Sequence, residues 1–354
     1  MLIPGLFLLV ISSREALIES TKQGKITLPP RTQVQSQMKQ QSFASLTYAA
    51  KKRKTRKERF LEQMESCVPW TAFEAIIEPY YPKAGKRGGQ PIGLSVMLRI
   101  YLMQQWFNLS DPMMEDALYE IESMRRFAGL ELCEDRLPDE TTILKFRHLL
   151  EKHQLTEGLF AAVSEHLQRH GLQLSKGTMV DATLIAASPS TKNKKGERDP
   201  EMHQTRKGKQ WHFGMKIHVG ADVNSGTAHT VTVTAANEAD INQLPALLRE
   251  DDEVIFGDAG YTSDSYKRGA RALGLSWKVN DKRKPKRGNL SSKQRKRNRQ
   301  QSRVRARVEH LFRIIKCQFG YRQVRYRGLE KNRIQVMSLM AMANLYLQRR
   351  ALAV

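Results

Sequence analysis

The fold of this 354-residue chain is decided by the stretch Ile255-Phe256-Gly257-Asp258-Ala259-Gly260-Tyr261. A short apolar run typical of a β-strand leads directly into an aspartate and a glycine turn, and a helix-compatible segment follows. This order places a carboxylate at the carboxyl end of a strand, where open α/β sheets bind their ligands. The sequence therefore predicts that Asp258 lies at a functional edge of a sheet.

Two more acidic residues occupy informative settings, one before and one after this stretch. Asp181 lies inside the apolar run Val180-Asp181-Ala182-Thr183, which has the composition of a strand, and Glu309 lies in a basic helical segment. Carboxylates from two strands and a helix supply the hard oxygen ligands that suit a divalent cation such as Mg²⁺. We predict that Asp181, Asp258 and Glu309 are the metal ligands and the catalytic residues.

The segment that carries Glu309 has an apolar stripe. At about 100° per residue, one face is formed by Val304, Val308, Leu311, Phe312, Ile315 and Phe319. Glu309 falls on the border of this stripe, where it could reach a metal from a helix packed on the sheet. An ion pair with Arg305 or Arg313, one helical turn away, is the simpler interpretation of a lone glutamate. The two upstream aspartates favour the metal.

The composition indicates a polyanionic partner. The chain has 59 Lys and Arg against 36 Asp and Glu, which gives a net charge of +23. Such basicity in a folded protein points to nucleic acid. A membrane is not expected, because no apolar run approaches the roughly 20 residues that span a bilayer. The three cysteines lack metal-binding spacing and are expected to be reduced thiols.

Changes in hydrophobic period divide the chain into three parts. Residues 1–50 are expected to be a leader, either disordered or the result of a misassigned start. Residues 51–171 have helical spacing and should form an all-α DNA-binding region. Residues 172–354 should form an α/β catalytic domain, a mixed five-stranded sheet with flanking helices. Its strands are expected at 177–187, 212–221, 227–236, 253–257 and 275–279, and its helices at 239–250, 263–273, 302–319 and 332–349.

The helical part contains one candidate DNA-reading helix. Ser110 and Asp139 precede helical segments and are expected to be N-caps. The helix that opens at Asp139 has polar residues at its front and carries Lys145, Arg147 and His148, as the recognition helix of a helix-turn-helix would. An ordinary helical bundle explains the same pattern, so the sequence does not decide which helix reads DNA.

Two basic runs are further candidates for phosphate contacts. One covers residues 51–59, and the other is the polar segment 281–299, which is expected to be a loop or arm inserted in the catalytic domain. A solvated surface is the alternative interpretation of each run. The contacts predicted from them are Lys51, Lys52, Arg53, Lys54, Arg295 and Arg297.

From about Met38 onward, the chain resembles DDE-type insertion-sequence transposases of the insertion-sequence-five-like family. The resemblance is carried by Val180 to Thr183, the stretches 199–203 and 211–216, the turn 258–261, and the segment 305–316. It implies a ribonuclease-H-like catalytic domain that cuts and joins DNA through an Asp-Asp-Glu triad. Related transposases have a Tyr, Arg, Glu, Lys signature that spans the helix containing the last of these segments. Arg305, Glu309 and Lys316 match it, Ser302 stands at the tyrosine position, and Arg305 and Lys316 are implied to contact DNA phosphates.

The resemblance also implies the partners. These are Mg²⁺, which Mn²⁺ could replace, and double-stranded DNA in the form of terminal inverted repeats and target DNA. A homodimer on DNA is expected because both ends of the element must be cut, and the location is expected to be cytoplasmic and nucleoid-associated. The alternatives are a non-catalytic DNA-binding protein and a structure-selective nuclease of the same fold. Three clustered acids argue against the first, because binding a polyanion does not require them, and strand-transfer products would distinguish the second.

Overall fold

The computed structural model describes residues 48, 50–85, 90–194, 196–283 and 289–353. Contacts divide the chain into two units, Met1–Arg53 and Lys54–Val354. The expected leader at residues 1–50 lies outside the described residues except for positions 48 and 50. The elements discussed below belong to the second unit.

The described residues between 54 and 170 are mainly helical, as predicted. Its elements are α3 (Arg56–Cys67), α4 (Trp70–Ile77), η2 (Glu78–Tyr80), α5 (Leu94–Phe107), α6 (Asp111–Glu120), α7 (Glu122–Ala128), α8 (Glu140–Lys152) and α9 (Leu155–Arg169). Both predicted N-caps are confirmed, because the Ser110 and Asp139 side chains accept hydrogen bonds from the backbone amides of Met113 and Thr142.

The described structure favours a helical bundle over a helix-turn-helix. α7 and α8 are joined by residues 129–139, whereas a helix-turn-helix joins its helices by a turn of about three or four residues. α8 buries Ile143, Phe146 and Leu150 and contacts α5, α6 and α9. Its apolar face therefore serves the core of the bundle.

Among the described residues the sheet is mixed and has six strands, one more than predicted. They are β1 (Gly177–Ala186), β2 (His203–Lys207), β3 (Gln210–Asp222), β4 (Ala228–Ala235), β5 (Val254–Gly257) and β6 (Ser276–Val279). The order is β2-β3-β1-β5-β6, and β4 pairs with β3. β3 is antiparallel to β1, β2 and β4, whereas β1, β5 and β6 run parallel. The prediction missed β2 because its residues are largely exposed and polar, with no apolar alternation.

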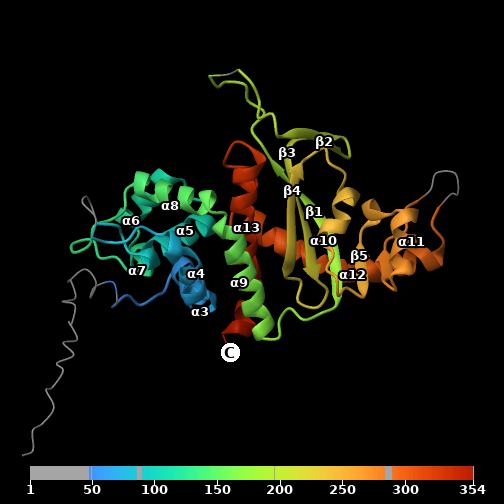
Figure 1. Ribbon diagram of the computed structural model, residues 1–354, viewed down its shortest axis with the longest axis horizontal. Helices are drawn as coiled ribbons and strands as arrows, with labels where there is room; N and C mark the ends of the chain where they lie inside the picture. The colour runs from blue at the N-terminus through green and yellow to red at the C-terminus, as the bar shows by residue number, and fades with distance from the viewer. Residues whose placement is uncertain (1–47, 49, 86–89, 195, 284–288, 354) are drawn as a thin grey trace, which may run out of the picture. The chain divides into compact units, whose positions relative to one another are not determined.

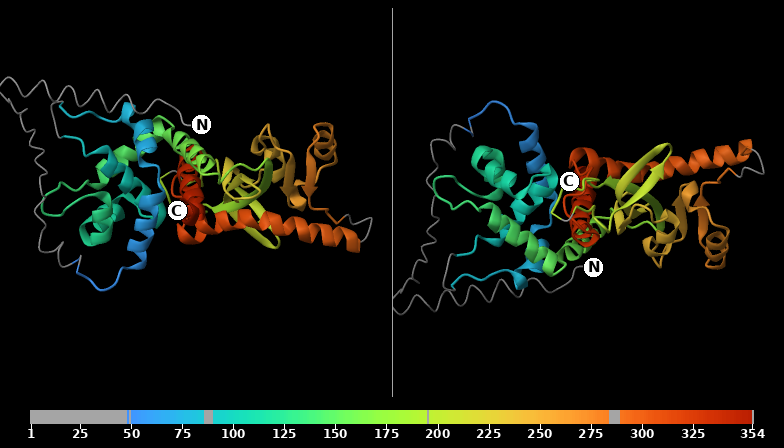
Figure 2. Two further views of the ribbon diagram at one scale, coloured as in Figure 1. Left: turned by 90° about the horizontal axis from the view of Figure 1, so that it is seen from below. Right: turned by 90° about the horizontal axis from the view of Figure 1, so that it is seen from above.

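The remaining helices cover both faces of the sheet. They are η3 (Asp240–Gln243), α10 (Leu244–Leu247), η4 (Ala259–Tyr261), α11 (Asp264–Ala272), α12 (Ser292–Arg313), the π-helical segment η6 (Ile314–Gln318) and α13 (Leu329–Leu352). Figure 2 shows α12 along one face of the sheet and α10 and α11 on the other. Met179 belongs to the same core as Val308 of α12, whereas Val180 packs with Leu244 of α10. Asp181 therefore faces α12.

Two predicted segments have different boundaries in the structure. The helix expected at 239–250 is only η3 followed by α10, because the chain becomes extended at Leu248. The arm expected at 281–299 is helical from Ser292, where a capping box between Ser291 and Gln294 opens α12. Residues 284–288 of that arm lie outside the described residues. The first turns of α12 escaped prediction because their basic side chains form no apolar stripe.

The helical part and the sheet share one hydrophobic core. α13 packs against α3, α9 and β4, and Figure 1 shows it beside α9. The Tyr101 and Ser338 hydroxyls are 2.8 Å apart within this core. Although α13 has 24 residues, neither it nor any other helix in the described ranges is long and apolar enough to cross a membrane. The three cysteines, all within those ranges, are free as expected.

Candidate active site

The candidate site lies where β5 ends and β1 continues. The parallel register aligns Met179 with Phe256, and two further steps place Asp181 across from Asp258. After Gly257 the chain leaves the sheet, and the edge of β1 beyond Asp181 lines a cavity of about 500 Å³. This is the carboxyl-end edge at which parallel strands present functional residues.

Asp181, Asp258 and Glu309 all line this cavity. Asp258 is fixed by its turn, because its Oδ1 accepts a hydrogen bond of 2.8 Å from the Gly260 amide. A Cβ at residue 260 would lie 2.9 Å from that oxygen, so a larger residue there would displace the Asp258 carboxylate from this position. Glu309 is the least constrained of the three acids, since 60% of its side chain is exposed.

The guanidinium of Arg305 lies between two of the acids. Its Nη1 donates to Asp181 Oδ2 at 2.5 Å, and its Nη2 lies 3.4 Å from Glu309 Oε1. The second Asp181 oxygen accepts a bond of 2.9 Å from the Ala182 amide. The Arg305–Glu309 ion pair, the simpler interpretation of the sequence, is therefore present, and the same arginine also binds Asp181.

The carboxylates of these acids are chemically suited to a divalent cation, but in this conformation they are not arranged to share one. Their carboxylate oxygens are the hard ligands that Mg²⁺ prefers. Within the described ranges, however, no group of three His, Cys, Asp or Glu side chains is arranged so that it could hold a metal ion. In this conformation the guanidinium of Arg305 contacts both Asp181 and Glu309 and so places a positive charge between them.

Burial controls the protonation of the groups beside the cavity. It raises the pKa of Asp181 to about 6, an effect that Arg305 opposes and Asp258 reinforces. Burial also raises the pKa of Tyr261, with smaller contributions from the nearby Asp240, Asp181 and Asp258. The Tyr261 hydroxyl is buried and has no hydrogen-bond partner among the described residues.

A second ion pair borders the cavity. Lys216 Nζ donates to Asp240 Oδ1 at 2.8 Å and to the Glu238 carbonyl at 2.7 Å, and both Lys216 and Asp240 line the cavity. His218, two residues along β3, is fully buried, and burial lowers its pKa to about 4, so it is neutral at physiological pH. Sequence reasoning missed Lys216 and Asp240. The signal was the polar alternation of Lys216 and His218 in an otherwise apolar strand.

Basic residues of β2 lie at the cavity, and a lysine of η6 lies near one of them. Arg206 and Lys207 line the cavity from β2. Burial lowers the pKa of Lys316 in η6, and the positive charges of Lys207 and Arg322 lower it further. Lys207, Lys316 and Arg322 form what we call the cationic group. Only Lys316 was predicted, and Lys207 was missed because β2 was not recognised as a strand.

The two basic residues predicted on α8 have different environments. Lys145 is exposed and borders a separate cavity of about 460 Å³. Arg147 differs from the prediction, because it is buried and paired with Asp111 at 3.3 Å and Glu151 at 2.6 Å. Its guanidinium also lies 4.4 Å from the centre of the Tyr326 ring. We therefore omit Arg147 from the proposed DNA contacts.

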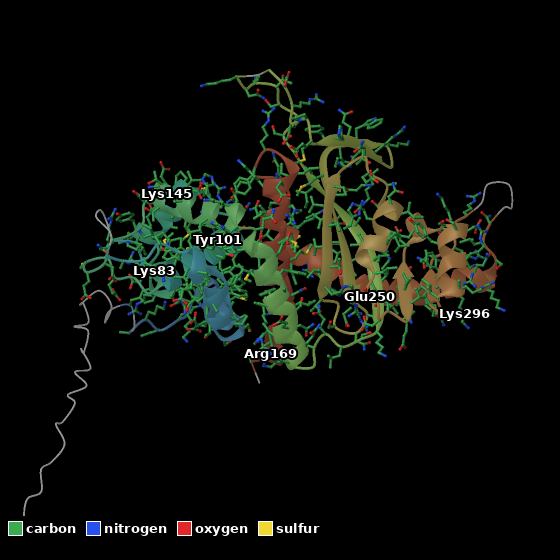
Figure 3. The ribbon with its side chains drawn as sticks, viewed as in Figure 1. Lys83, Tyr101, Lys145, Arg169, Glu250 and Lys296 are labelled. Atoms are coloured by element: carbon green, nitrogen blue, oxygen red, sulfur yellow. The ribbon has the colours of Figure 1, made fainter. Side chains whose placement is uncertain are left out.

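The other predicted DNA contacts are not among the residues that line the cavity. Those with exposed side chains are Lys52, Arg53, Lys54, Arg295 and Arg297. Lys51 is half-buried, and Lys54 and Arg297 form ion pairs with Glu62 and Asp281. Figure 3 labels Lys296, which lies between Arg295 and Arg297 in sequence, on the opposite side of the view from Lys145.

Two family models match the chain. The model described as "Transposase DDE domain" matches residues 173–345, which contain the sheet, the three acids and most of α13. The model described as "Transposase domain (DUF772)" matches residues 49–149, which contain most of the helical part. The cavity with its acids lies wholly within the first match.

Proposed function

The chain belongs to the DDE-type insertion-sequence transposases, which are metal-dependent enzymes of DNA cleavage and strand transfer, and from this premise we propose how its residues divide that work. Asp181, Asp258 and Glu309 are the catalytic triad and the metal ligands. The observation that supports this assignment is that all three line one cavity at the carboxyl edge of parallel strands. The pair of matched domains is consistent with the insertion-sequence-five-like family.

We propose that residues 172–354 have a ribonuclease-H-like fold, which the antiparallel β3, the central β1 and the parallel β5 support. The metal is Mg²⁺, and Mn²⁺ substitutes for it. Bound metal ions activate the attacking water or 3′-hydroxyl and stabilise the leaving oxygen. Strand β1 fixes Asp181 and the turn after β5 fixes Asp258, whereas the Glu309 side chain, which is 60% exposed, can complete the ligand set once it leaves its ion pair with Arg305.

The substrate DNA is proposed to comprise the terminal inverted repeats of the element and its target. Arg305, Lys316 and Lys207 bind phosphates near the reacting bond, because they lie at or beside the acidic cavity. Contacts at the periphery come from Lys51, Lys52, Arg53, Lys54, Lys145, Arg295 and Arg297. Phosphate contacts position DNA without specifying its sequence. A homodimer that acts in the cytoplasm on nucleoid DNA would bring both ends together.

The triad is tested by Asp181→Asn, Asp258→Asn and Glu309→Gln. Each should bind a duplex carrying the element's end with nearly wild-type affinity, because the basic surface remains. Each should lose nicking and strand transfer by a factor of about 100 or more, since a metal ligand is missing. Glu250→Gln, which removes an exposed acid elsewhere, is the matched control. Retained nicking in any one variant would remove that residue from the triad.

A further inference from the structure

Arg305 occupies the position from which it can keep the proposed metal ligands apart. We infer that its guanidinium holds the free enzyme in a state that binds metal weakly, and that a DNA phosphate releases this state by withdrawing the guanidinium. The inference rests on the proposed function, because it takes Asp181 and Glu309 to be metal ligands. It adds that metal loading and DNA-end binding are coupled through one side chain.

The hydrogen bonds of Asp181 support the first half of this inference. One carboxylate oxygen accepts from the Ala182 amide at 2.9 Å and the other from Arg305 at 2.5 Å. A cation at this carboxylate would therefore lie next to a positive guanidinium. In a partly buried site the two charges repel strongly, since solvent screens them poorly. The metal and Arg305 therefore compete to neutralise Asp181, because each weakens the binding of the other.

The pair with Glu309 extends the same competition to a second ligand. Arg305 Nη2 lies 3.4 Å from Glu309 Oε1, so one guanidinium engages acids from both β1 and α12. The other cavity-lining acid outside the triad, Asp240, already has Lys216 at 2.8 Å. Withdrawal of Arg305 would thus free two triad acids at once and leave the Lys216 pair intact.

A phosphate is the ligand best suited to withdraw Arg305. The planar guanidinium binds phosphate oxygens in a bidentate manner. The Arg305 Nε is buried without a hydrogen-bond partner in the described part of the chain, so a donor is available. Lys316, on the same continuous helical segment, belongs to the cationic group that would attract the DNA backbone. DNA at this group brings a phosphate within reach of Arg305.

Coupling of this kind is reciprocal, so DNA must tighten metal binding as much as metal tightens DNA binding. An enzyme with this property would carry few metal ions while free and would load them at a DNA end. Cleavage away from an end would then be suppressed by the fold itself.

The experiment measures Mn²⁺ binding to the full-length chain without DNA, by electron paramagnetic resonance of the free ion. Arg305→Gln should lower the Kd for Mn²⁺ by about tenfold, within the usual range of coupling. Arg303→Gln, which removes an equal charge from an exposed position two residues away, should change it by about twofold or less. Equal effects of the two substitutions would overturn the inference.

The second arm adds a duplex that carries the element's end. Wild-type affinity for Mn²⁺ should rise by about the same factor, whereas that of Arg305→Gln should change little. An equal rise in both would overturn the inference. Thermal melting checks that the variants fold. Arg305→Lys serves if the glutamine variant does not fold, and should give an intermediate Kd because an ammonium cannot donate to both acids in the same way.

Asp181→Asn separates this inference from the proposed function. If it leaves Mn²⁺ binding unchanged in both the wild-type and Arg305→Gln backgrounds, the proposed metal site itself is wrong. If it weakens Mn²⁺ binding while Arg305→Gln fails to strengthen it, the metal site stands and only the role of Arg305 is rejected.

Discussion

Asp181 lies in a position where burial disfavours its ionised form. Burial on β1 raises its pKa from an ordinary value of 3.8 to about 6, even though Arg305 binds it. The pKa of Asp181 is higher in the folded state than in the unfolded state. The contribution of its protonated carboxyl to the free energy of unfolding is therefore fully present below about pH 4 and is lost as pH rises through about 6. The free protein is therefore destabilised at neutral pH by the charge that its chemistry requires.

Asp181→Asn should consequently stabilise the metal-free protein at neutral pH. We expect a gain on the order of 2 kcal/mol in the free energy of unfolding, shrinking toward zero near pH 4. Urea unfolding in EDTA across this pH range would measure it, with the exposed Glu250→Gln as the variant expected to match wild type. A stability difference that does not vary with pH would contradict the effect of burial.

Asp240 is a cavity-lining acid to which we assign a structural role. Its partner Lys216 is only 16% exposed, so Asp240→Asn would leave a nearly buried ammonium without its 2.8 Å ion pair. The variant should lose about 1–3 kcal/mol of stability yet retain nicking per folded molecule. Thermal melting and nicking of the same preparation would test this. Lost nicking with unchanged stability would instead place Asp240 among the catalytic acids.

At the scale of single elements, a helix or strand could be predicted from the sequence where it buries one apolar face. The stripe through Val308 and Leu311 predicted α12 because those residues pack on the sheet. The predicted position of Asp258, directly after a strand and at the start of a turn, is confirmed because strand and turn signals are local. β2 and the first turns of α12 bury little, and so produce no apolar period. The Arg305–Glu309 pair follows from helical spacing, but the Arg305–Asp181 pair depends on how α12 docks on β1.

The exposed start of α12 depends on its cap rather than on packing. Ser291 accepts from the Gln294 amide, and the Gln294 side chain accepts from the Ser291 amide. Ser291→Ala should therefore cost about 1 kcal/mol locally and fray the first turns. Hydrogen exchange should quicken at residues 292–298 and stay unchanged at residues 304–313, which pack on the sheet. Ser292→Ala is the control within the helix, and equal exchange in both variants would show that the cap is not needed.

At the scale of the whole molecule, long-range contacts could not be predicted from sequence. Asp199 and Glu201 accept hydrogen bonds from the Gly328 and Leu329 amides, at 2.7 and 2.6 Å, where α13 begins. The stretch 199–203, recognised only as a family motif, thus fixes the helix that joins the sheet to the helical part. Such hydrogen bonds depend on the tertiary arrangement and leave no local hydrophobic pattern in the sequence.

The distribution of basic charge leads to a test of which surfaces meet DNA. Removal of one side chain that binds a phosphate should reduce the slope of log K against log salt concentration by about 0.9. We expect replacement of Lys52, Arg53 and Lys54 by glutamine to flatten the slope by about 2 to 3, because these side chains are exposed and carry no apolar packing. Replacement of Arg295, Lys296 and Arg297 should have a similar effect.

The control for this experiment removes the same number of charges from α11, at the exposed residues Lys267, Arg268 and Arg271. A general reduction of positive charge would flatten all three slopes equally, because it acts through the field of the whole protein. Binding at specific phosphates would flatten the slope only where the replaced side chains touch the DNA. Equal slopes in all three variants would therefore show that both basic runs are solvated surface rather than DNA contacts. Arg305, Lys316 and Lys207 would then remain as the proposed phosphate-binding residues near the acids.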